Sequence, residues 1–227
     1  MNCMDSRNNT PLLLATRNNN PKGIHNDPRH QRQQRLDIVQ QLIAAGALVN
    51  VKNAERMTSL LYAYSYGDVE IVKLLLSHGG REAPVNVAAK DGYNPLLYAV
   101  SSRSIDIVQL LVEAGADINY ANSKELKFDP KDWMKDMPRN AALHIAIAND
   151  DVDMLEFLLK NGADPNRTSE FEDTALKFAV SQPRNHQLSI LKLLLSHGAD
   201  MYRSGIFEKV VSLGDMAQTR FFSRKWL

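Results

Sequence analysis

The sequence predicts an all-α solenoid, a stack of helix-turn-helix units with β-hairpin-like finger loops. Close copies of residues 89–119 recur along most of the 227-residue chain, at intervals near ~33 residues that mark a stacked-repeat architecture. The apolar residues of each copy follow helical spacing. Most copies also end in a glycine, a residue that commonly terminates helices. In such a stack each unit contacts only its neighbours, so the chain needs no single large core.

The repeat is clearest in residues 89–119, which read AKDGYNPLLYAVSSRSIDIVQLLVEAGADIN. The pattern D-G-x-[TN]-P-L-x-x-A, followed by I-V-x-L-L and then by G-A-D-x-N, resembles the ankyrin repeat. The resemblance covers roughly residues 5–227 and implies one ankyrin-repeat domain over residues 1–227. Its units fall at approximately 5–50, 51–86, 87–119, 120–166, 167–200 and 201–227, the last being a C-terminal capping repeat.

Two recurring sets of apolar positions are expected to hold the stack together. The first helix of each unit carries a leucine and, three residues later, an alanine whose small side chain lets adjacent helices approach closely. These alanines are Ala15, Ala63, Ala99, Ala146 and Ala179. The second helix of each unit begins with an apolar pair, such as Ile107 and Val108 in the third unit. Substituting Ala99 by glutamate is therefore expected to destabilise the fold.

The first unit contains an insert at 17–35, between its first helix and a second helix expected over 37–43. The insert is polar, holds two prolines and carries five basic residues against one aspartate, so it cannot bury a core. We expect a mobile or partly helical loop. It is either a solvated linker or a contact for an acidic partner or RNA, although basic charge without interleaved aromatic residues is a weak indication of nucleic-acid binding.

A second insert at 120–139 lengthens the finger of the fourth unit. Asp129-Pro130 is a typical helix start, and Pro138 ends the segment, so a short helix carrying Trp133 is expected there. Its apolar side chains either fold back onto the neighbouring repeats or form an exposed anchor for a partner, because tryptophan and methionine are enriched at interface cores.

Composition excludes several classes of function. The net charge of +1 argues against a nucleic-acid partner. No apolar run approaches the ~18 residues of a membrane span, and the N-terminus does not resemble a signal peptide. The single cysteine, Cys3, cannot form an internal disulfide, which fits a reducing compartment. We therefore expect a cytoplasmic, monomeric protein without a membrane partner, or one exported by a route that uses no N-terminal signal.

No catalytic, metal-binding or cofactor-binding group is predicted, and we expect no enzymatic activity. Three of the six histidines lie in recurring repeat elements, and His25 and His30 have no third ligand nearby. A glycine-rich phosphate loop is absent from the sequence. Function must therefore lie in the surface of the stack, and the partner is expected to be another protein.

The ankyrin resemblance implies which positions face that partner, because the finger tips and the exposed side of the first helices line a concave groove in this family. Carried over one by one, they are Glu55, Met57, Tyr66, Lys90, Asp91, Tyr93, Ser102, Asn140, Asn149, Phe171 and Asp173, with Trp133 added from the second insert. Met57, Tyr93 and Phe171 are expected near the finger tips, either as exposed hot spots or packed on a neighbouring finger.

Three functions are compatible with this surface. The sequence neither chooses among them nor identifies the partner. The first is a non-catalytic interaction module that binds through the concave finger surface. The second is the targeting region of a larger enzyme or of a secreted effector. The third is an inhibitor that blocks a partner enzyme with the Trp133 finger.

Overall fold

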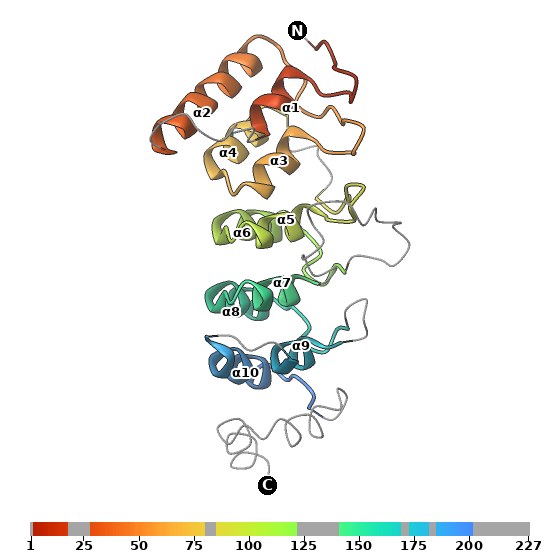
Figure 1. The fold of residues 1–227 in the computed structure, drawn as a ribbon, viewed down its shortest axis with the longest axis vertical. Helices are drawn as coiled ribbons and strands as arrows, with labels where there is room; N and C mark the ends of the chain where they lie inside the picture. Colours follow the sequence, from red (N-terminus) through yellow and green to blue (C-terminus); the bar gives the residue numbers. More distant parts are fainter. Residues whose placement is uncertain are drawn as a thin grey trace. The chain divides into compact units, whose positions relative to one another are not determined.

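The fold was analysed in a computed structural model, which describes residues 2–17, 28–79, 85–121, 141–168, 173–181 and 185–201 (Figure 1). Within those ranges the secondary structure is helical, and the only strand-like pairing is an isolated antiparallel bridge between Thr168 and Thr174. The all-α fold class is thereby confirmed. The chain divides into two compact units, Met1–Asp117 and Ile118–Leu227, which are described separately.

The first unit contains three helix pairs, labelled in Figure 1: α1 (Pro11–Thr16) with α2 (Pro28–Ala44), α3 (Ser59–Ser65) with α4 (Val69–Ser77), and α5 (Pro95–Ser101) with α6 (Ile105–Glu113). The short first helices of the pairs pack against one another in the order α1, α3, α5, and the second helices pack as α2, α4, α6. Each pair therefore contacts its neighbours on two parallel rows, as a stacked-repeat architecture requires.

The second unit repeats the arrangement with two pairs: α7 (Ala142–Ala148) with α8 (Val152–Lys160), and α9 (Ala175–Ser181) with α10 (Gln187–Ser196). Helix α7 packs on α9 and α8 packs on α10. Most of the second insert, at 122–139, and most of the expected C-terminal capping repeat, at 202–227, lie outside the described residues.

The short first helices of the first unit begin directly after their N-cap residues. The side chains of Thr10, Thr58 and Asn94 accept hydrogen bonds from the backbone N–H three residues later, at 3.3, 3.2 and 2.9 Å, which satisfies a donor left free in the first helical turn. Proline follows the cap in α1 and α5, where its missing N–H costs nothing. The predicted starts of α1, α3 and α5 are thus confirmed.

Most of the predicted core positions are buried, although Ala15 in α1 is only partly buried. Ala63, Ala99 and Ala146 have no exposed surface, and Ala179 is 1% exposed. The second-helix positions Ile107 and Val108 are likewise fully buried. These residues fill the spaces between successive helix pairs within each unit, so the periodicity in the sequence reports stacking contacts.

A recurring asparagine ties each finger loop to the end of the next second helix. Asn86 donates to the Gly115 carbonyl at 3.4 Å and accepts from the Asp117 N–H at 2.9 Å. In the second unit, Asn119 makes the same two contacts to Gly162 and Asp164, at 3.1 and 2.8 Å. Because both amide atoms are used, this side chain fixes the spacing of consecutive repeats.

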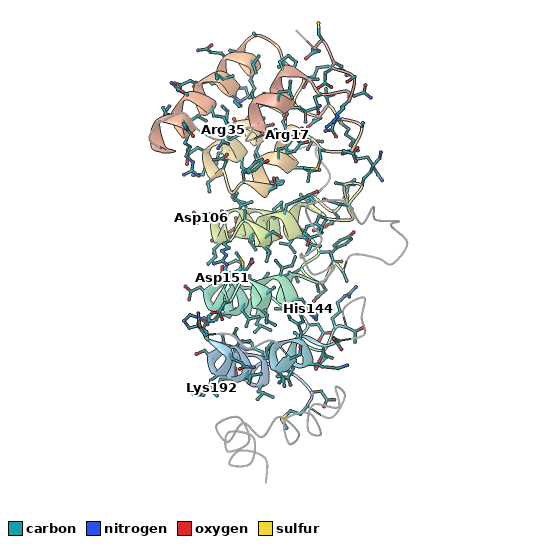
Figure 2. All side chains as sticks on the ribbon, viewed as in Figure 1. Arg17, Arg35, Asp106, His144, Asp151 and Lys192 are labelled. Atoms are coloured by element: carbon teal, nitrogen blue, oxygen red, sulfur yellow. The ribbon has the colours of Figure 1, made fainter. Side chains whose placement is uncertain are left out.

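Helix α2 begins at Pro28 rather than at Asp37, so the later half of the first insert is a continuous extension of the second helix. Arginine and glutamine, which fill 31–35, are good helix formers, and proline is favoured in the first turn. The extension is also anchored. Arg32 Nε donates to Asp68 at 3.1 Å, and Arg35, labelled in Figure 2, donates to the other oxygen of the same carboxylate. Two of the basic charges considered for an external partner are therefore paired internally.

Over the ranges that the structure covers, no helix is both long and apolar enough to cross a lipid bilayer.

Candidate partner-binding surface

The finger loops of the first unit are shaped by side chains that accept from their own backbone. Asn53 Oδ1 accepts from the N–H groups of Glu55 and Met57 at 3.0 and 2.9 Å. Asp91 Oδ1 accepts from the N–H of Tyr93 at 3.0 Å in the next finger. Such local bonds are the means by which asparagine and aspartate stabilise tight turns. The two fingers thus have defined conformations without strand pairing of their own.

Backbone hydrogen bonds join successive fingers at their tips. The Ala54 N–H donates to the Arg7 carbonyl at 3.0 Å, and the Lys90 N–H donates to the Glu55 carbonyl at 3.2 Å. Glu55 and Lys90 are therefore held on neighbouring tips, and both side chains are exposed. Neither takes part in an ion pair within the described ranges, so both charges face solvent.

One residue of each tip has a left-handed backbone. Asn8, Arg56 and Gly92 occupy the same position in successive fingers, with φ angles of 60°, 61° and 82°. Glycine adopts this conformation at no steric cost, whereas a long side chain such as that of Arg56 does so less readily. The turn places the Arg56 side chain in an exposed position beside Glu55.

The expectation that Met57 and Tyr93 are exposed hot spots is wrong, because they are only 8% and 3% exposed. The Tyr93 ring contacts the Tyr98 ring at a centroid distance of 5.4 Å, and the Tyr98 hydroxyl lies 3.3 Å from Met57 Sδ. Tyr93 precedes the cap residue of α5 and Tyr98 is its fourth helical residue, which is the arrangement of a hydrophobic staple. The alternative, that these residues pack within the protein, is closer to what is observed, although both contact Tyr98 of helix α5 rather than a neighbouring finger.

Asp91 lies between the buried aromatic residues and the exposed tip. Its Oδ2 accepts from the Tyr98 hydroxyl at 2.5 Å. Burial raises the pKa of this carboxyl, the Tyr98 hydrogen bond opposes the shift, and the charge of Glu55 adds to it. Asp91 therefore orders the base of the finger and presents less free carboxylate to a partner than Glu55 does.

Two further predicted residues lie at the ends of first helices in the same unit. Tyr66 is the C-cap of α3 and is 42% exposed, while Ser102 is the C-cap of α5 and is partly buried. The Ser102 hydroxyl donates to the Ala99 carbonyl at 2.9 Å. Tyr66 is thus the large side chain that this part of the surface offers to a partner, and Ser102 is mainly a helix-ending residue.

In the second unit, the structure describes Asn149 and Asp173 from the predicted set. Asn149 is the partly buried C-cap of α7. Asp173 forms an ion pair with Lys177 at 2.5 Å, and its backbone carbonyl accepts from His144 Nε2 at 3.0 Å. His144, labelled in Figure 2, is 1% exposed, and its ring packs at a tilt against the Phe178 ring, with the ring centroids 5.6 Å apart. Asp173 therefore has a structural role alongside any contact with a partner.

His144 makes the second unit sensitive to acid. Burial lowers the pKa of His144 from 6.5 to about 4, and the Asp173 carbonyl only partly opposes this. The folded state favours the neutral ring. The contribution of His144 to the free energy of unfolding is therefore fully present above pH 6.5 and is lost as the pH falls from 6.5 towards 4. A drop from pH 7.5 to 5 should cost about 2 kcal/mol through this one group.

Urea unfolding of the wild-type and His144→Asn proteins at both pH values checks this expectation. The wild type should lose more stability on acidification than the variant, and the exposed histidines, present in both proteins, cancel in the comparison. Equal losses in the two proteins would show that His144 is not the group responsible.

Three predicted residues, Trp133, Asn140 and Phe171, lie outside the described residues. The structure brings together the five that surround the two fingers of the first unit, namely Glu55, Met57, Lys90, Asp91 and Tyr93.

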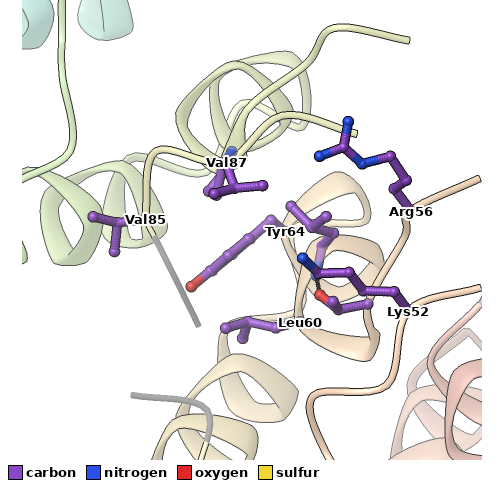
Figure 3. A pocket seen from close by; sticks show the side chains of 9 residues that line it. Lys52, Arg56, Leu60, Tyr64, Val85 and Val87 are labelled. Carbon is purple, nitrogen blue, oxygen red and sulfur yellow. Dashed lines mark hydrogen bonds between the residues drawn. The ribbon is translucent and has the colours of Figure 1, made fainter. Parts of the chain in front are cut away.

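A small pocket in the first unit was not anticipated from the sequence (Figure 3). It lies where the finger of α3 meets the loop that leads into the next finger. The residues that line it are Lys52, Arg56, Thr58, Leu60, Leu61, Tyr64, Val85, Val87 and Pro95. One residue in the sequence could have indicated the pocket. Tyr64 is aromatic, whereas the corresponding positions of the other first helices hold Thr16, Val100, Ile147 and Val180.

The described part of the chain contains no cluster of three histidine, cysteine or acidic side chains able to hold a metal ion. Its strongly buried titratable groups, such as His144 and Tyr98, are engaged in contacts between neighbouring repeats.

Comparison with known proteins identifies the repeats. A family model described as ankyrin repeats (3 copies) matches residues 31–122, and a second, ankyrin repeats (many copies), matches residues 143–195. The two matches cover 92 and 53 residues, together 145 of 227. No curated protein sequence matched this chain significantly.

Among solved structures, the chain is similar to the ankyrin repeat domain of Bcl-3, a member of the IkappaB protein family. The TM-score is 0.64 with 23% sequence identity, and the match covers 88% of this chain and 74% of that one. A likeness at this identity is informative about the fold alone.

Proposed function

Because this chain belongs to the ankyrin repeat family, whose repeats are generally protein–protein interaction modules, we propose that it binds a protein partner through the finger tips of its first unit. The proposed contact surface consists of Glu55, Arg56 and Lys90 on the tips, with Tyr66 at the end of α3. We call this set the finger surface. It acts by binding, and its own residues carry out no chemical step.

The observation that carries the proposal is the pair of solvent-facing charges on adjacent fingers. The backbone bond between the Lys90 N–H and the Glu55 carbonyl fixes the distance between the two tips, and the side chains themselves are unpaired in the described ranges. A partner therefore meets charged groups on an ordered backbone, which reduces the entropy lost on binding. Mixed charges of this kind mainly determine which partner is accepted and how fast it associates.

Tyr66 supplies the apolar part of the finger surface. Tyrosine is enriched at interface hot spots, because its ring gives a large contact area and its hydroxyl gives a polar end. We also propose a role in this function for three predicted residues outside the described ranges, namely Trp133, Asn140 and Phe171. That residues 1–227 form a single array of repeats is likewise a proposal. Asn149 and Asp173 are proposed as weaker contributors from the second unit.

Exchanging the two charges tests the proposal. The variant Glu55→Lys/Lys90→Glu reverses both signs and keeps the net charge, so non-specific electrostatic attraction is unchanged. Quantitative affinity capture from cells expressing the chain should recover specific partners with the wild type and at least tenfold less with this variant. A tenfold loss corresponds to about 1.4 kcal/mol, within the range of an interface charge reversal.

The matched control is Glu70→Lys/Lys73→Glu, which exchanges an exposed pair on α4. Both variants should melt within a few degrees of the wild type, because exposed charges contribute little to stability. Equal recovery of partners with the finger variant and the wild type would overturn the proposal.

A further inference from the structure

The tips of the first three fingers carry a row of exposed charges. Arg7 lies on the finger that precedes α1, Glu55 and Arg56 lie on the finger that precedes α3, and Lys90 lies on the finger that precedes α5. We call these four residues the tip row. All four are exposed, and their side chains form no ion pair or side-chain hydrogen bond among the residues that the structure describes. Three positive charges and one negative charge thus cross three consecutive repeats.

Backbone hydrogen bonds fix the spacing of the tip row. The Ala54 N–H donates to the Arg7 carbonyl at 3.0 Å, and the Lys90 N–H donates to the Glu55 carbonyl at 3.2 Å. Residues joined in this way have Cα atoms roughly 5 Å apart, and consecutive Cα atoms lie about 3.8 Å apart. The backbone path from Arg7 through Glu55 to Lys90 is therefore roughly 14 Å long at most.

The other carboxylates of these fingers are occupied by the fold. Asp5 Oδ1 accepts from the Arg7 N–H at 2.8 Å, which shapes the first finger. Asp91 Oδ2 accepts from the Tyr98 hydroxyl at 2.5 Å at the base of the third finger. Glu55, by contrast, holds its carboxylate in solvent between cations on either side of it along the row. The order of charges that a partner meets is therefore positive, negative, positive.

This order favours a protein segment over a continuous polyanion. Guanidinium and ammonium groups bind carboxylates and phosphates alike, so the cations alone do not distinguish the two. A nucleic acid would place phosphate charge against Glu55, and single strands are usually held by aromatic faces that the tip row does not contain. A peptide can place a basic residue opposite Glu55, which turns the like-charge repulsion into an attraction.

We propose that the tip row binds an extended acidic segment of a partner protein, in which acidic residues facing Arg7 and Lys90 flank a basic residue facing Glu55. In an extended chain every second side chain points to the same face, and each residue advances the chain by about 3.3 Å. Side chains i, i+2 and i+4 then span about 13 Å, close to the length of the tip row. Further acidic residues of the segment pair with Arg56.

This inference rests on the proposed function and deepens it, because it gives the chemistry of the segment that binds to the fingers. Partner capture with the Glu55/Lys90 exchange asks whether these fingers bind a partner at all. Peptides of defined charge order, together with variants of Arg7, ask which sequence they accept. The two proposals can therefore fail separately.

The test uses synthetic fluorescent peptides and the full chain, with binding followed by fluorescence anisotropy. The probe, EESKSEE, has a central lysine between acidic residues. One comparison peptide, KESESEE, has the same composition with the lysine moved to the end, and a second, EESESEE, replaces the lysine by glutamate. We expect EESKSEE to bind at least about fivefold more tightly than either, and more weakly as the salt concentration rises.

Charge reversals assign that binding to the tip row. Arg7→Glu should weaken the binding of EESKSEE by about tenfold or more, because it sets two acidic groups against each other. The matched control, Lys73→Glu on α4, changes the net charge by the same amount and should alter the affinity by less than about twofold. Thermal melts of both variants should lie within a few degrees of the wild type, since exposed charges contribute little to stability.

Glu55→Lys provides a test that loss of fold cannot imitate. This variant should reverse the preference of the wild type and bind EESESEE at least about fivefold more tightly than EESKSEE, because the basic residue of the probe now meets a positive charge. A preference that stays unchanged in Glu55→Lys would contradict the pairing of Glu55 with a basic residue and overturn the inference.

Two further outcomes would also overturn it. Wild-type protein that binds EESESEE as tightly as EESKSEE would identify a general polyanion site, and equal effects of Arg7→Glu and Lys73→Glu would show that the peptide does not bind at the tip row. Any of these results, combined with partner capture that still depends on Glu55 and Lys90, would leave the proposed function standing.

Discussion

Replacing Ala99 by glutamate should destabilise the first unit by roughly 5 kcal/mol or more. Ala99 is completely buried in α5, where the first helices of successive pairs meet. A carboxylate there would lose its hydration without gaining a partner, and its extra atoms would force neighbouring helices apart. Since whole domains are stable by only about 5–15 kcal/mol, we expect partial or complete unfolding of this unit at room temperature.

Circular dichroism melts of the variant measure this effect, with Ala114→Glu as the matched control. Ala114 is the exposed C-cap of α6, so the same substitution should cost less than about 1 kcal/mol there. A melt of Ala99→Glu that coincides with that of Ala114→Glu would contradict the stacking of α5 against its neighbours.

The second large effect is expected at Asp68. Its carboxylate is 3% exposed and pairs with Arg35, whose side chain is 17% exposed, and with the more exposed Arg32. Asp68→Ala should cost about 3–5 kcal/mol, because removing one member of a buried pair leaves the other charge uncompensated. The loss should release the extended α2 from the turn between α3 and α4.

Urea unfolding of Asp68→Ala, Arg35→Met and the double variant separates this pair from its surroundings. The double variant should be less destabilised than the sum of the single ones, since Arg35 no longer needs a counter-charge once it is replaced. Glu70→Ala, which removes an exposed carboxylate two residues away, should change stability by less than about 0.5 kcal/mol. Additive effects of Asp68→Ala and Arg35→Met would contradict the coupling.

The stack was predictable because its contacts recur. Leu96 and Ala99 lie three residues apart on α5, and the same spacing appears in every first helix. A helix that must pack on both neighbours requires small and apolar residues at fixed positions, so periodicity alone identifies the buried face. The helix caps Thr10, Thr58 and Asn94 were predictable for a similar reason, because their hydrogen bonds are local.

The directions of side chains in the fingers were harder to predict. Tyr93 and Met57 each directly precede a helix cap, whereas Phe171 lies three residues before Thr174, so the three do not share a register. The contact between Tyr93 and Tyr98 explains why Tyr93 is buried. The order of apolar and polar residues within the finger does not predict this contact. Exposed residues without a packing role, such as Glu55 and Lys90, were correctly expected on the surface.

Other features depend on partners distant in the sequence. The start of α2 at Pro28 is stabilised by Asp68, which lies 33 residues beyond Arg35 and has no local pattern that links the two. The pocket arises from the finger of α3 together with Val85 and Val87 of the following loop. Tyr64 stands out in the sequence, but its place in the pocket wall is apparent only once its neighbours are known.

The most direct test of the central claim is the amount of partner captured by Glu55→Lys/Lys90→Glu relative to Glu70→Lys/Lys73→Glu. Both variants exchange one exposed acidic and one exposed basic residue in the same compact unit, so they differ only in whether the finger surface or α4 is altered. The account predicts a ratio of about one-tenth or lower. A ratio near one, with both proteins folded, would contradict it.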